Sequence, residues 1–281
     1  MSETVHLVST SKLNLSLLVF RSRPDGYHPL WSIFQEIDLS DTMHVTLTNE
    51  RKWTLTCSNP DVPTDDRNIL SRLYHRFVDD IDTGLLVHID KGIPLGAGLG
   101  GASANAARFL VWMNSHFHWA YSESQLMEIG AEFGADVPFF IRGGTALVQG
   151  IGDQITPISP GLNRVFLLIN PGLHLSTPEV FSYYDSDAQY HRCDNDIDEC
   201  ILTSHLGPND LKQSVFDRYP IYSEIQAIIA HYNGPELYMT GSGATVFLAL
   251  ESIDDAQLWA NRLQLVFPSF WFRVSRALFP L

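Results

Sequence analysis

The sequence predicts an α+β protein of two domains, and three observations support this. The chain has 281 residues, a length that suits one large domain or two ordinary ones. In the first half, strand patterns precede a glycine-rich loop that opens directly into a helix. In the second half, strands and helices follow the order β-α-β-β-α-β with extra helix inserted, which is the ferredoxin-like pattern. Glycine and proline cluster at 150–161, so we expect the domains to span residues 1–155 and 156–281.

The elements of the first half follow from periodicity and capping signals. Alternating apolar residues predict strands, which we place at 13–20, 43–48, 53–57 and 85–90. Apolar residues at helical spacing predict helices at 66–80, 101–116 and 123–133. The last of these begins with a capping box formed by Ser122 and Gln125.

The second half has the same kinds of signal. Short apolar runs predict strands at 165–169, 236–240, 245–250 and 270–276. A helix is predicted to begin with Thr177 as its N-cap and Pro178 at its first position, and further helices are predicted at 221–232 and 254–266. The acidic stretch 185–200 is predicted to be a surface excursion.

Composition and charge exclude several classes of protein. The 18 Lys and Arg stand against 32 Asp and Glu, a net charge of −14. A field of this sign repels nucleic acid and anionic membranes, so we expect neither as a partner. The sequence has no apolar run of transmembrane length, and its first residues do not form a signal-peptide pattern. Three widely spaced cysteines indicate neither a disulfide framework nor a thiolate metal site, which favours a reducing, cytoplasmic compartment.

The strongest functional signal is the segment PLGAGLGGASAN at 94–105. Four glycines in six residues cost conformational entropy, and their usual use is close approach of the backbone to a ligand. Free amides of such a loop and the N-terminus of the following helix attract phosphate. We therefore predict a phosphate-binding loop here, with a flexible connector as the alternative.

The loop does not match the commonest nucleotide motifs. A P-loop would need Lys after its last glycine, but Ala102 follows Gly101. The spacing of Gly96, Gly98 and Gly101 matches the dinucleotide fingerprint, but Lys91–Leu95 separates it from the preceding strand. The further motifs of protein kinases are absent from the sequence.

Two more segments carry single candidate residues. Lys12 and Asn14 share the strand face opposite a leucine stripe, where a lysine is most often solvated. Asp136 is the one carboxylate of the apolar run Gly134–Phe140, where it could simply cap a helix. A carboxylate in such surroundings is costly unless a cation or other partner lies nearby.

These segments occur in a fixed order that resembles a known family. The order is Lys12-Leu-Asn14, Asp25-Gly-Tyr27-His28, the loop at 94–105, Gly134-Ala-Asp136-Val-Pro138 and Thr240-Gly-Ser-Gly-Ala244. It is similar to the GHMP kinase superfamily, and within it to the kinases of 4-diphosphocytidyl-2-C-methyl-D-erythritol in the non-mevalonate isoprenoid pathway. The Asp25–His28 element makes the narrower resemblance, because mevalonate and homoserine kinases share the glycine loop without it. Ser11 departs from the family's usual alanine, and Ala97, Ala102 and Ala104 stand where glycine or serine is common.

The resemblance implies a fold, an activity and site residues. The fold would be an N-terminal ATP-binding domain like ribosomal protein S5 and a C-terminal ferredoxin-like substrate domain. The activity would be ATP-dependent phosphorylation of the 2-hydroxyl of 4-diphosphocytidyl-2-C-methyl-D-erythritol, with Mg²⁺ and with Ser103 as a possible metal ligand. The ATP phosphates would be wrapped by Pro94, Leu95, Gly96, Ala97, Gly98, Leu99, Gly100, Gly101, Ala102, Ser103 and Ala104, with Gly241–Ala244 close by as a second glycine loop.

The same resemblance assigns the remaining roles. Asp136 would take the proton from the acceptor hydroxyl, and Lys12 would polarise that hydroxyl and keep Asp136 ionised. Tyr27 and Phe181 would stack on the cytosine, and His28 would form a hydrogen bond to its edge. Asn14 and Thr177 would contact the erythritol and diphosphate portion. We expect a monomer or weak homodimer, and the alternatives are another GHMP-type kinase, mevalonate- or homoserine-like, or a non-catalytic nucleotide-binding module.

Overall fold

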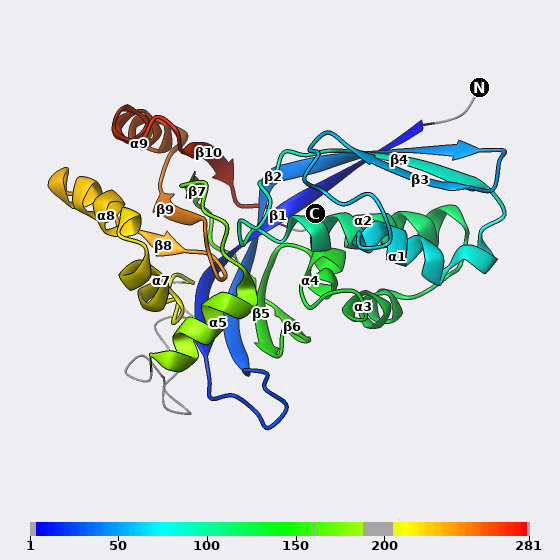
Figure 1. The fold of residues 1–281 in the computed structure, drawn as a ribbon, viewed down its shortest axis with the longest axis horizontal. Helices are drawn as coiled ribbons and strands as arrows, with labels where there is room; N and C mark the ends of the chain where they lie inside the picture. Colours follow the sequence, from blue (N-terminus) through cyan, green and yellow to red (C-terminus); the bar gives the residue numbers. More distant parts are fainter. Residues whose placement is uncertain (1–3, 160, 188–204, 280–281) are drawn as a thin grey trace. The chain divides into compact units, whose positions relative to one another are not determined.

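A computed structural model describes residues 4–159, 161–187 and 205–279, which form two compact units (Figure 1). The first unit comprises the described residues of Met1–Ser11, Leu39–Leu95 and Gly100–Gly143. The second comprises Lys12–Asp38, Gly96–Leu99 and the described residues of Gly144–Leu281. The boundary predicted after residue 155 falls inside the second unit and stays a prediction. The predicted excursion at 185–200 lies outside the described residues from position 188 onward.

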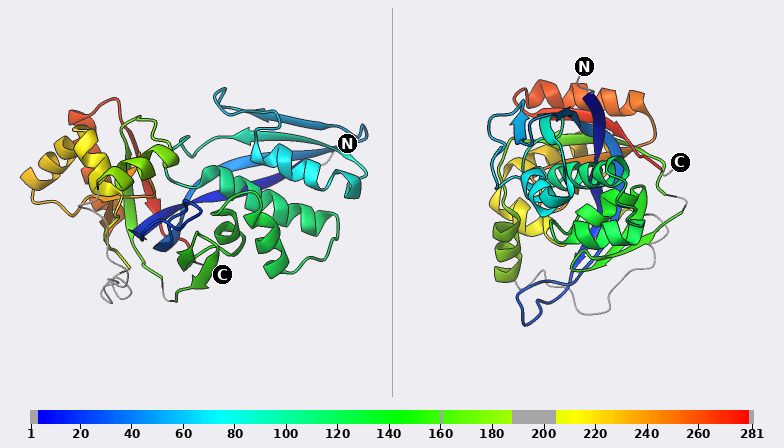
Figure 2. Two further views of the ribbon diagram at one scale, coloured as in Figure 1. Left: turned by 60° about the horizontal axis from the view of Figure 1, so that its bottom comes forward. Right: turned by 90° about the vertical axis from the view of Figure 1, so that its right-hand side faces the viewer.

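Two long strands contribute to both units, β1 (Thr4–Val19) and β2 (Leu30–Thr48). In the first unit, β2 pairs antiparallel with β4 (Gly84–Asp90), which pairs parallel with β3 (Trp53–Cys57). Helices α1 and α2 lie on one face of β3 and β4 (Figures 1 and 2). The helices of this unit are α1 (Ile69–Arg76), α2 (Gly101–His116), α3 (Glu123–Ala131) and α4 (Val137–Arg142), with a 3-10 turn at Val78–Asp80.

The core of the first unit fills the space between these helices and the strands. Leu70 and Leu73 of α1 pack with Phe109 and Leu110 of α2 against Val87 of β4 and its neighbours. The apolar residues whose helical spacing predicted α1 and α2 are therefore confirmed as the buried faces of these helices. The predicted start at residue 66 is too early, because Asn68 caps α1 by accepting from the backbone nitrogen of Leu70.

The second unit holds two short strands on β2 and a separate four-stranded sheet. Strand β5 (Thr145–Gly150) pairs with Leu30–Gln35 of β2, and β6 (Gln154–Pro157) pairs with β5. The other sheet contains β7 (Val165–Asn170), β8 (Tyr238–Met239), β9 (Val246–Leu250) and β10 (Trp271–Arg276). Its spatial order is β10-β7-β9-β8, and every pairing is antiparallel.

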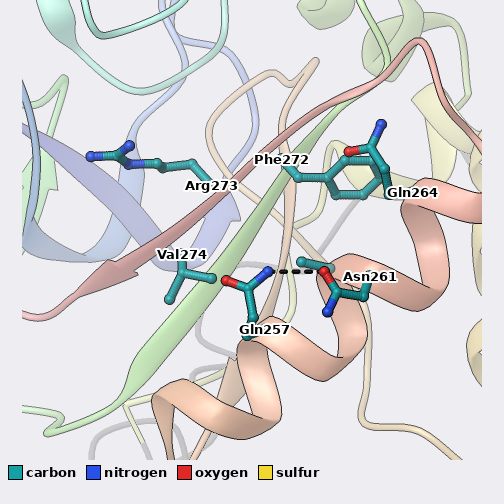
Figure 3. Close-up of a pocket in the computed structure, with 7 residues that line it drawn as sticks. Gln257, Asn261, Gln264, Phe272, Arg273 and Val274 are labelled. Carbon is teal, nitrogen blue, oxygen red and sulfur yellow. Dashed lines mark hydrogen bonds between the residues drawn. The ribbon is translucent and has the colours of Figure 1, made fainter.

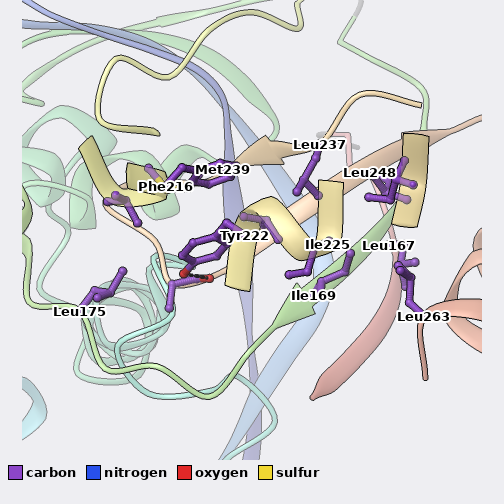
Figure 4. Close-up of a cluster of buried hydrophobic side chains, with 14 of the residues drawn as sticks. Leu167, Ile169, Leu175, Phe216, Tyr222, Ile225, Leu237, Met239, Leu248 and Leu263 are labelled. Atoms are coloured by element: carbon purple, nitrogen blue, oxygen red, sulfur yellow. Dashed lines mark hydrogen bonds between the residues drawn. The ribbon is translucent and has the colours of Figure 1, made fainter. Parts of the chain in front are cut away.

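This order confirms the ferredoxin-like pattern, because the fourth and first strands are neighbours and the third separates the first from the second. Its helices are α5 (Thr177–Ser186), α7 (Lys212–Arg218), α8 (Ile221–His231) and α9 (Ile253–Val266). Ile225 of α8 and Leu263 of α9 belong to one core with Leu167 and Ile169 of β7, so both helices cover the same face of the sheet (Figure 4).

Several local expectations are corrected by the structure. Ser176, not Thr177, caps α5 by accepting from the backbone nitrogen of Glu179, and Thr177 is the first helical residue. Helix α4, strands β5 and β6, and helix α7 were not predicted, because each is short and α4 contains an uninterrupted apolar run. Of the helices in the described parts of the chain, none combines the length and apolar character needed to cross a membrane.

Candidate active site

Lys12 and Asn14 lie on the same face of β1, in its portion that belongs to the second unit. The Lys12 side chain is buried, with 4% of the residue exposed, and its Nζ donates to Oδ1 of Asn14 at 2.5 Å. The ammonium also lies 4.6 Å from the centre of the Phe34 ring. A buried ammonium is costly without partners, so this placement favours a functional role over a solvated strand end.

Thr240 connects three segments that are far apart in the sequence. Its Oγ1 accepts from the backbone nitrogen of Asn14 at 3.0 Å. The same hydroxyl lies 3.3 Å from both Oδ1 of Asn14 and the carbonyl oxygen of Gly98, either of which can accept its proton. Strand β1, the glycine loop and the turn after β8 therefore meet at one buried hydroxyl. Thr240 belongs to the motif at 240–244, which by itself gives its side chain no role.

The middle of the glycine loop packs closely on that turn. Gly98 has a φ of +72°, and a Cβ built there would lie 2.6 Å from the carbonyl oxygen of Thr240 and 2.7 Å from that of Gly243. The backbone nitrogen of Lys12 donates to the carbonyl of Leu99 at 3.0 Å, which ties the loop to β1 as well. Gly98 is thus required for contact between two backbone segments, in addition to any approach of phosphate.

The second glycine loop is held by side chains from two other segments. Asn209 is buried, and its Nδ2 donates to the carbonyl oxygens of Met239 at 2.9 Å and Gly241 at 2.8 Å. The hydroxyls of Thr177 and Ser242 lie 3.0 Å apart and share a hydrogen bond, which brings the start of α5 to this loop. The sequence indicates Thr177 and the loop that contains Ser242, but no local pattern distinguishes Asn209.

In the first unit, the start of α2 and the turn before α4 lie side by side. A Cβ built on Gly134 would be 3.5 Å from Oγ of Ser103, in the first turn of α2. That turn holds no acidic residue, so the positive end of the helix dipole is not neutralised from within the helix. Asp136 follows this turn as the half-buried N-cap of α4, and its side chain makes no capping hydrogen bond. Asp136 thus stands at the N-cap position, but its carboxylate does not cap the helix.

His28 and Phe181 come together at a cavity in the second unit. Nδ1 of His28 donates to the carbonyl of Phe20 at 2.7 Å, since only a protonated Nδ1 can bond to that oxygen. Its buried Nε2 lies 3.0 Å from Oδ1 of Asp185 but forms no hydrogen bond with it. The His28 and Phe181 rings lie 5.4 Å apart. The cavity has a volume of about 330 Å³ and is lined by Arg21, Ser22, His28, Tyr184 and Asp185.

Tyr27 is the neighbour of His28 on the same loop, and 63% of it is exposed. Tyr27 therefore does not belong to the core, and its ring is available to a ligand. Asp25 shapes the loop by accepting from the backbone nitrogen of Tyr27 at 3.2 Å and by pairing with Arg23.

The structure thus brings the predicted residues together in two groups. The group in the second unit contains Lys12, Asn14, Gly98, Thr177 and the second glycine loop, and the His28 and Phe181 pair lies in the same unit. The group in the first unit contains Ser103 and the turn before Asp136. The pairing of Lys12 with Asp136 stays a prediction. Among the described residues, no cluster of three or more His, Cys, Asp or Glu side chains could hold a metal ion.

A second hollow of about 330 Å³ lies between α9 and β10 (Figure 3). Side-chain amides dominate its helical wall, where Gln257 donates to Asn261 at 3.0 Å. Phe272 and Val274 form part of the opposite wall. None of the residues that the sequence indicated for the site lines this hollow.

Comparison with known proteins places these features in a family. The GHMP kinases N terminal domain family matches residues 68–144, which include the glycine loop and Asp136. A 4-diphosphocytidyl-2-C-methyl-D-erythritol kinase of Clostridium botulinum is 36% identical over 263 residues, covering 90% of this chain and 93% of its own. The chain belongs to this kinase family. The family's fold is confirmed as well, including the ferredoxin-like sheet.

Solved structures agree with the family assignment. The crystal structure of a 4-(cytidine 5'-diphospho)-2C-methyl-D-erythritol kinase superposes with a TM-score of 0.79 at 26% identity, covering 97% of this chain and 99% of the other. A homoserine kinase from Cytophaga hutchinsonii superposes with a TM-score of 0.73 at 15% identity, covering 99% and 96%. The second likeness shows a shared fold alone.

Proposed function

We propose that this chain transfers the γ-phosphate of ATP to the 2-hydroxyl of 4-diphosphocytidyl-2-C-methyl-D-erythritol, in the synthesis of isoprenoid precursors. Membership of the kinase family supports the reaction. The observation that carries the choice of substrate is that His28 lines a cavity and packs against the Phe181 ring, while Tyr27, the next residue along the chain, is exposed. Two aromatic side chains and one imidazole suit a pyrimidine base, because aromatic rings stack on bases and the imidazole reads a polar edge.

The proposed chemistry needs positioning and charge stabilisation more than covalent catalysis. The substrate hydroxyl oxygen forms a bond to the γ-phosphorus, and the bond from that phosphorus to the bridging oxygen of ADP breaks. Asp136 accepts the hydroxyl proton, which an alcohol does not release readily at neutral pH. Lys12 polarises the same oxygen, and Asn14 holds the ammonium through its 2.5 Å hydrogen bond.

The ATP phosphates would be bound by Pro94–Ala104 and the N-terminus of α2. Gly96, Gly98 and Gly100 all have positive φ, a loop geometry that only glycine adopts without strain. The middle of the loop is fixed before a ligand binds. It is fixed by the hydrogen bond from Thr240 to the Gly98 carbonyl and by the close packing of Gly98. A fixed loop loses less entropy on binding than a flexible one, which disfavours the alternative that it is only a connector.

Mg²⁺ suits this site although the described residues form no acidic cluster. Mg²⁺ usually keeps several waters and binds substrate phosphates through few protein ligands. Ser103, whose hydroxyl lies in the first turn of α2, would be the protein ligand. Bound there, the ion would shield the charge of the triphosphate.

We also propose that residues 1–155 bind ATP, that residues 156–281 form the substrate domain, and that the protein works in the cytoplasm as a monomer or weak homodimer. The three widely spaced cysteines, which suit a reducing compartment, support the cytoplasmic location.

A substrate panel scored by ADP release tests the proposal. The cytidine diphosphate compound should be phosphorylated, while mevalonate and homoserine should not. Turnover of either of those two alone would refute the substrate assignment and favour another GHMP-type kinase. ATP binding without turnover of any alcohol would favour the non-catalytic nucleotide-binding module.

A further inference from the structure

Asp41 is a fully buried carboxylate in the first unit, and four donors converge on it. The residue has 0% exposure and lies on β2. Its Oδ1 accepts from the backbone nitrogens of Gly92 and Ile93, each at 2.9 Å. Its Oδ2 accepts from Nζ of Lys91 at 2.5 Å and from Nδ2 of Asn105 at 3.0 Å. Both oxygens are thus saturated, which is what a buried charge requires.

These four donors stand at the two ends of the glycine loop. Lys91, Gly92 and Ile93 follow the end of β4 and lead directly into Pro94. Asn105 lies on α2 after the loop, and its amide is oriented by Ser9, whose hydroxyl donates to Oδ1. Ser9 and Asp41 thereby define which end of the Asn105 amide faces the carboxylate.

The side chain of Ile93 adds a packing contact between the same two ends. A Cβ built on Gly101, the first residue of α2, would lie 3.1 Å from Cγ2 of Ile93. Gly101 therefore lets the start of the helix rest on the residue that Asp41 holds by its backbone. One carboxylate and one apolar contact bring the two ends of the loop together.

We propose that Asp41 is a positioning residue for ATP, which sets the spacing of the two ends of the phosphate loop through Lys91, the Gly92 and Ile93 amides and Asn105. A loop with four glycines in six residues has few side chains with which to hold its own shape. Its geometry must come from the segments that flank it, and in the first unit both flanks bind Asp41. This inference rests on the proposed binding of ATP phosphates by the loop.

The decisive variant is Asp41→Asn, which keeps the shape of the side chain. An amide offers one acceptor oxygen, so it cannot serve the two backbone amides, Lys91 and Asn105 at once. We expect the Kd of a non-hydrolysable ATP analogue, measured by calorimetry, to rise about 10-fold or more, the scale for losing a hydrogen bond to a charged group. The KM for ATP should rise with it, while the KM for the alcohol substrate should change less than about 2-fold.

A matched control comes from the same strand. Asp38 also lies on β2, and its Oδ1 accepts from Oγ of Ser275 and from the backbone nitrogen of Arg276, far from the loop in sequence. Asp38→Asn should alter stability without changing the Kd of the ATP analogue. Equal rises in that Kd for Asp38→Asn and Asp41→Asn would overturn the proposal, since the effect would then be general destabilisation.

A milder variant covers the case in which Asp41→Asn does not fold. Lys91→Gln keeps a donor toward Oδ2 and removes the ammonium, and its Kd for the analogue should rise between 2- and 10-fold. Wild-type affinity in Lys91→Gln and in any folded Asp41→Asn would refute the positioning role. Failure of the wild-type protein itself to bind the analogue would instead refute the proposed function.

Discussion

The hydroxyl of Thr240 accepts a hydrogen bond from the backbone nitrogen of Asn14 at 3.0 Å, across 226 positions of the sequence. Both residues are buried, so the bond is shielded from water. It connects the strand that carries Lys12 to the turn that packs on the glycine loop. The Thr240 side chain thus bonds both to the strand that carries the candidate catalytic lysine and to the middle of the glycine loop.

Thr240→Val should destabilise the protein, because it leaves the buried backbone N–H of Asn14 without its acceptor. The variant side chain has nearly the same shape, so the effect reports the lost hydrogen bond. The expected loss is about 1–3 kcal/mol in the free energy of unfolding, measured by urea denaturation. Thr240→Ser, which keeps the hydroxyl, should lose much less of this energy. Equal stability of the Val and Ser variants would show that the hydrogen bond contributes nothing.

Alanine substitutions at Gly98 and Gly96 should differ in stability. Both glycines have positive φ, at +72° and +60°, so both variants carry the left-handed strain of about 1–2 kcal/mol. A Cβ at Gly98 meets two backbone oxygens, whereas at Gly96 it first meets the His174 side chain at 3.1 Å, which can move. Gly98→Ala should therefore have the lower melting temperature, and the reverse order would contradict the packing described for Gly98.

Tyr27→Ala should weaken binding of the cytidine substrate alone. Loss of stacking on a base costs about 1–3 kcal/mol, which would appear in the Kd of a cytidine diphosphate ligand. Because Tyr27 is exposed, its removal should leave the melting temperature unchanged. The matched control is Tyr232→Ala, because Tyr232 is an exposed tyrosine at the C-cap of α8. It should change neither the affinity for the cytidine ligand nor that for ATP. Parallel loss of ATP affinity in Tyr27→Ala would contradict a role specific to the base.

Asp136→Asn should lower turnover by about 10²–10⁴-fold with little change in ATP affinity, if the carboxylate is the general base. Lys12→Met should also slow turnover. The double variant should lose much less than the sum of the two losses, since residues that act on one hydroxyl are non-additive. Lys12→Met should also shift the acid limb of the pH–kcat profile upward. Additive losses with an unmoved acid limb would show that the two side chains act separately.

The ion pair between Asp187 and Arg218 should make stability depend on acidic pH. Arg218 donates to both carboxylate oxygens, at 2.6 and 3.1 Å, and these hydrogen bonds hold the pKa of Asp187 below its usual value. A lowered carboxyl pKa stabilises the fold above the unfolded pKa of about 4, and this stabilisation is lost as pH falls through the folded pKa. Between pH 5 and pH 2, the urea midpoint of the wild type should therefore fall more steeply than that of Asp187→Asn. Parallel slopes would exclude a contribution from this pair.

Periodicity and residue type are enough to predict most local elements and the chemistry of the candidate residues. Periodicity located α1, α2 and the ferredoxin-like half, because buried faces repeat every two or 3.6 residues wherever an element packs on a core. The glycine loop, the Asp25–His28 element and Asp136 were visible because their residue types are unusual in their settings. Short elements such as α4 cannot be predicted in this way, since six residues carry too little periodicity to distinguish a helix from a buried strand.

The polar side chains that hold the site together become apparent from the fold and not from local sequence. Asn209 and Asp41 are ordinary residues in their local sequence, and Thr240 belongs to a motif that gives its hydroxyl no role. Each acquires its role from hydrogen bonds to backbone groups that are distant along the chain. Asp185 likewise came to His28 through the packing of α5 in the second unit. A local pattern records which side of an element is buried, but the partner of a buried hydrogen-bonding group is set by the fold that brings distant segments together.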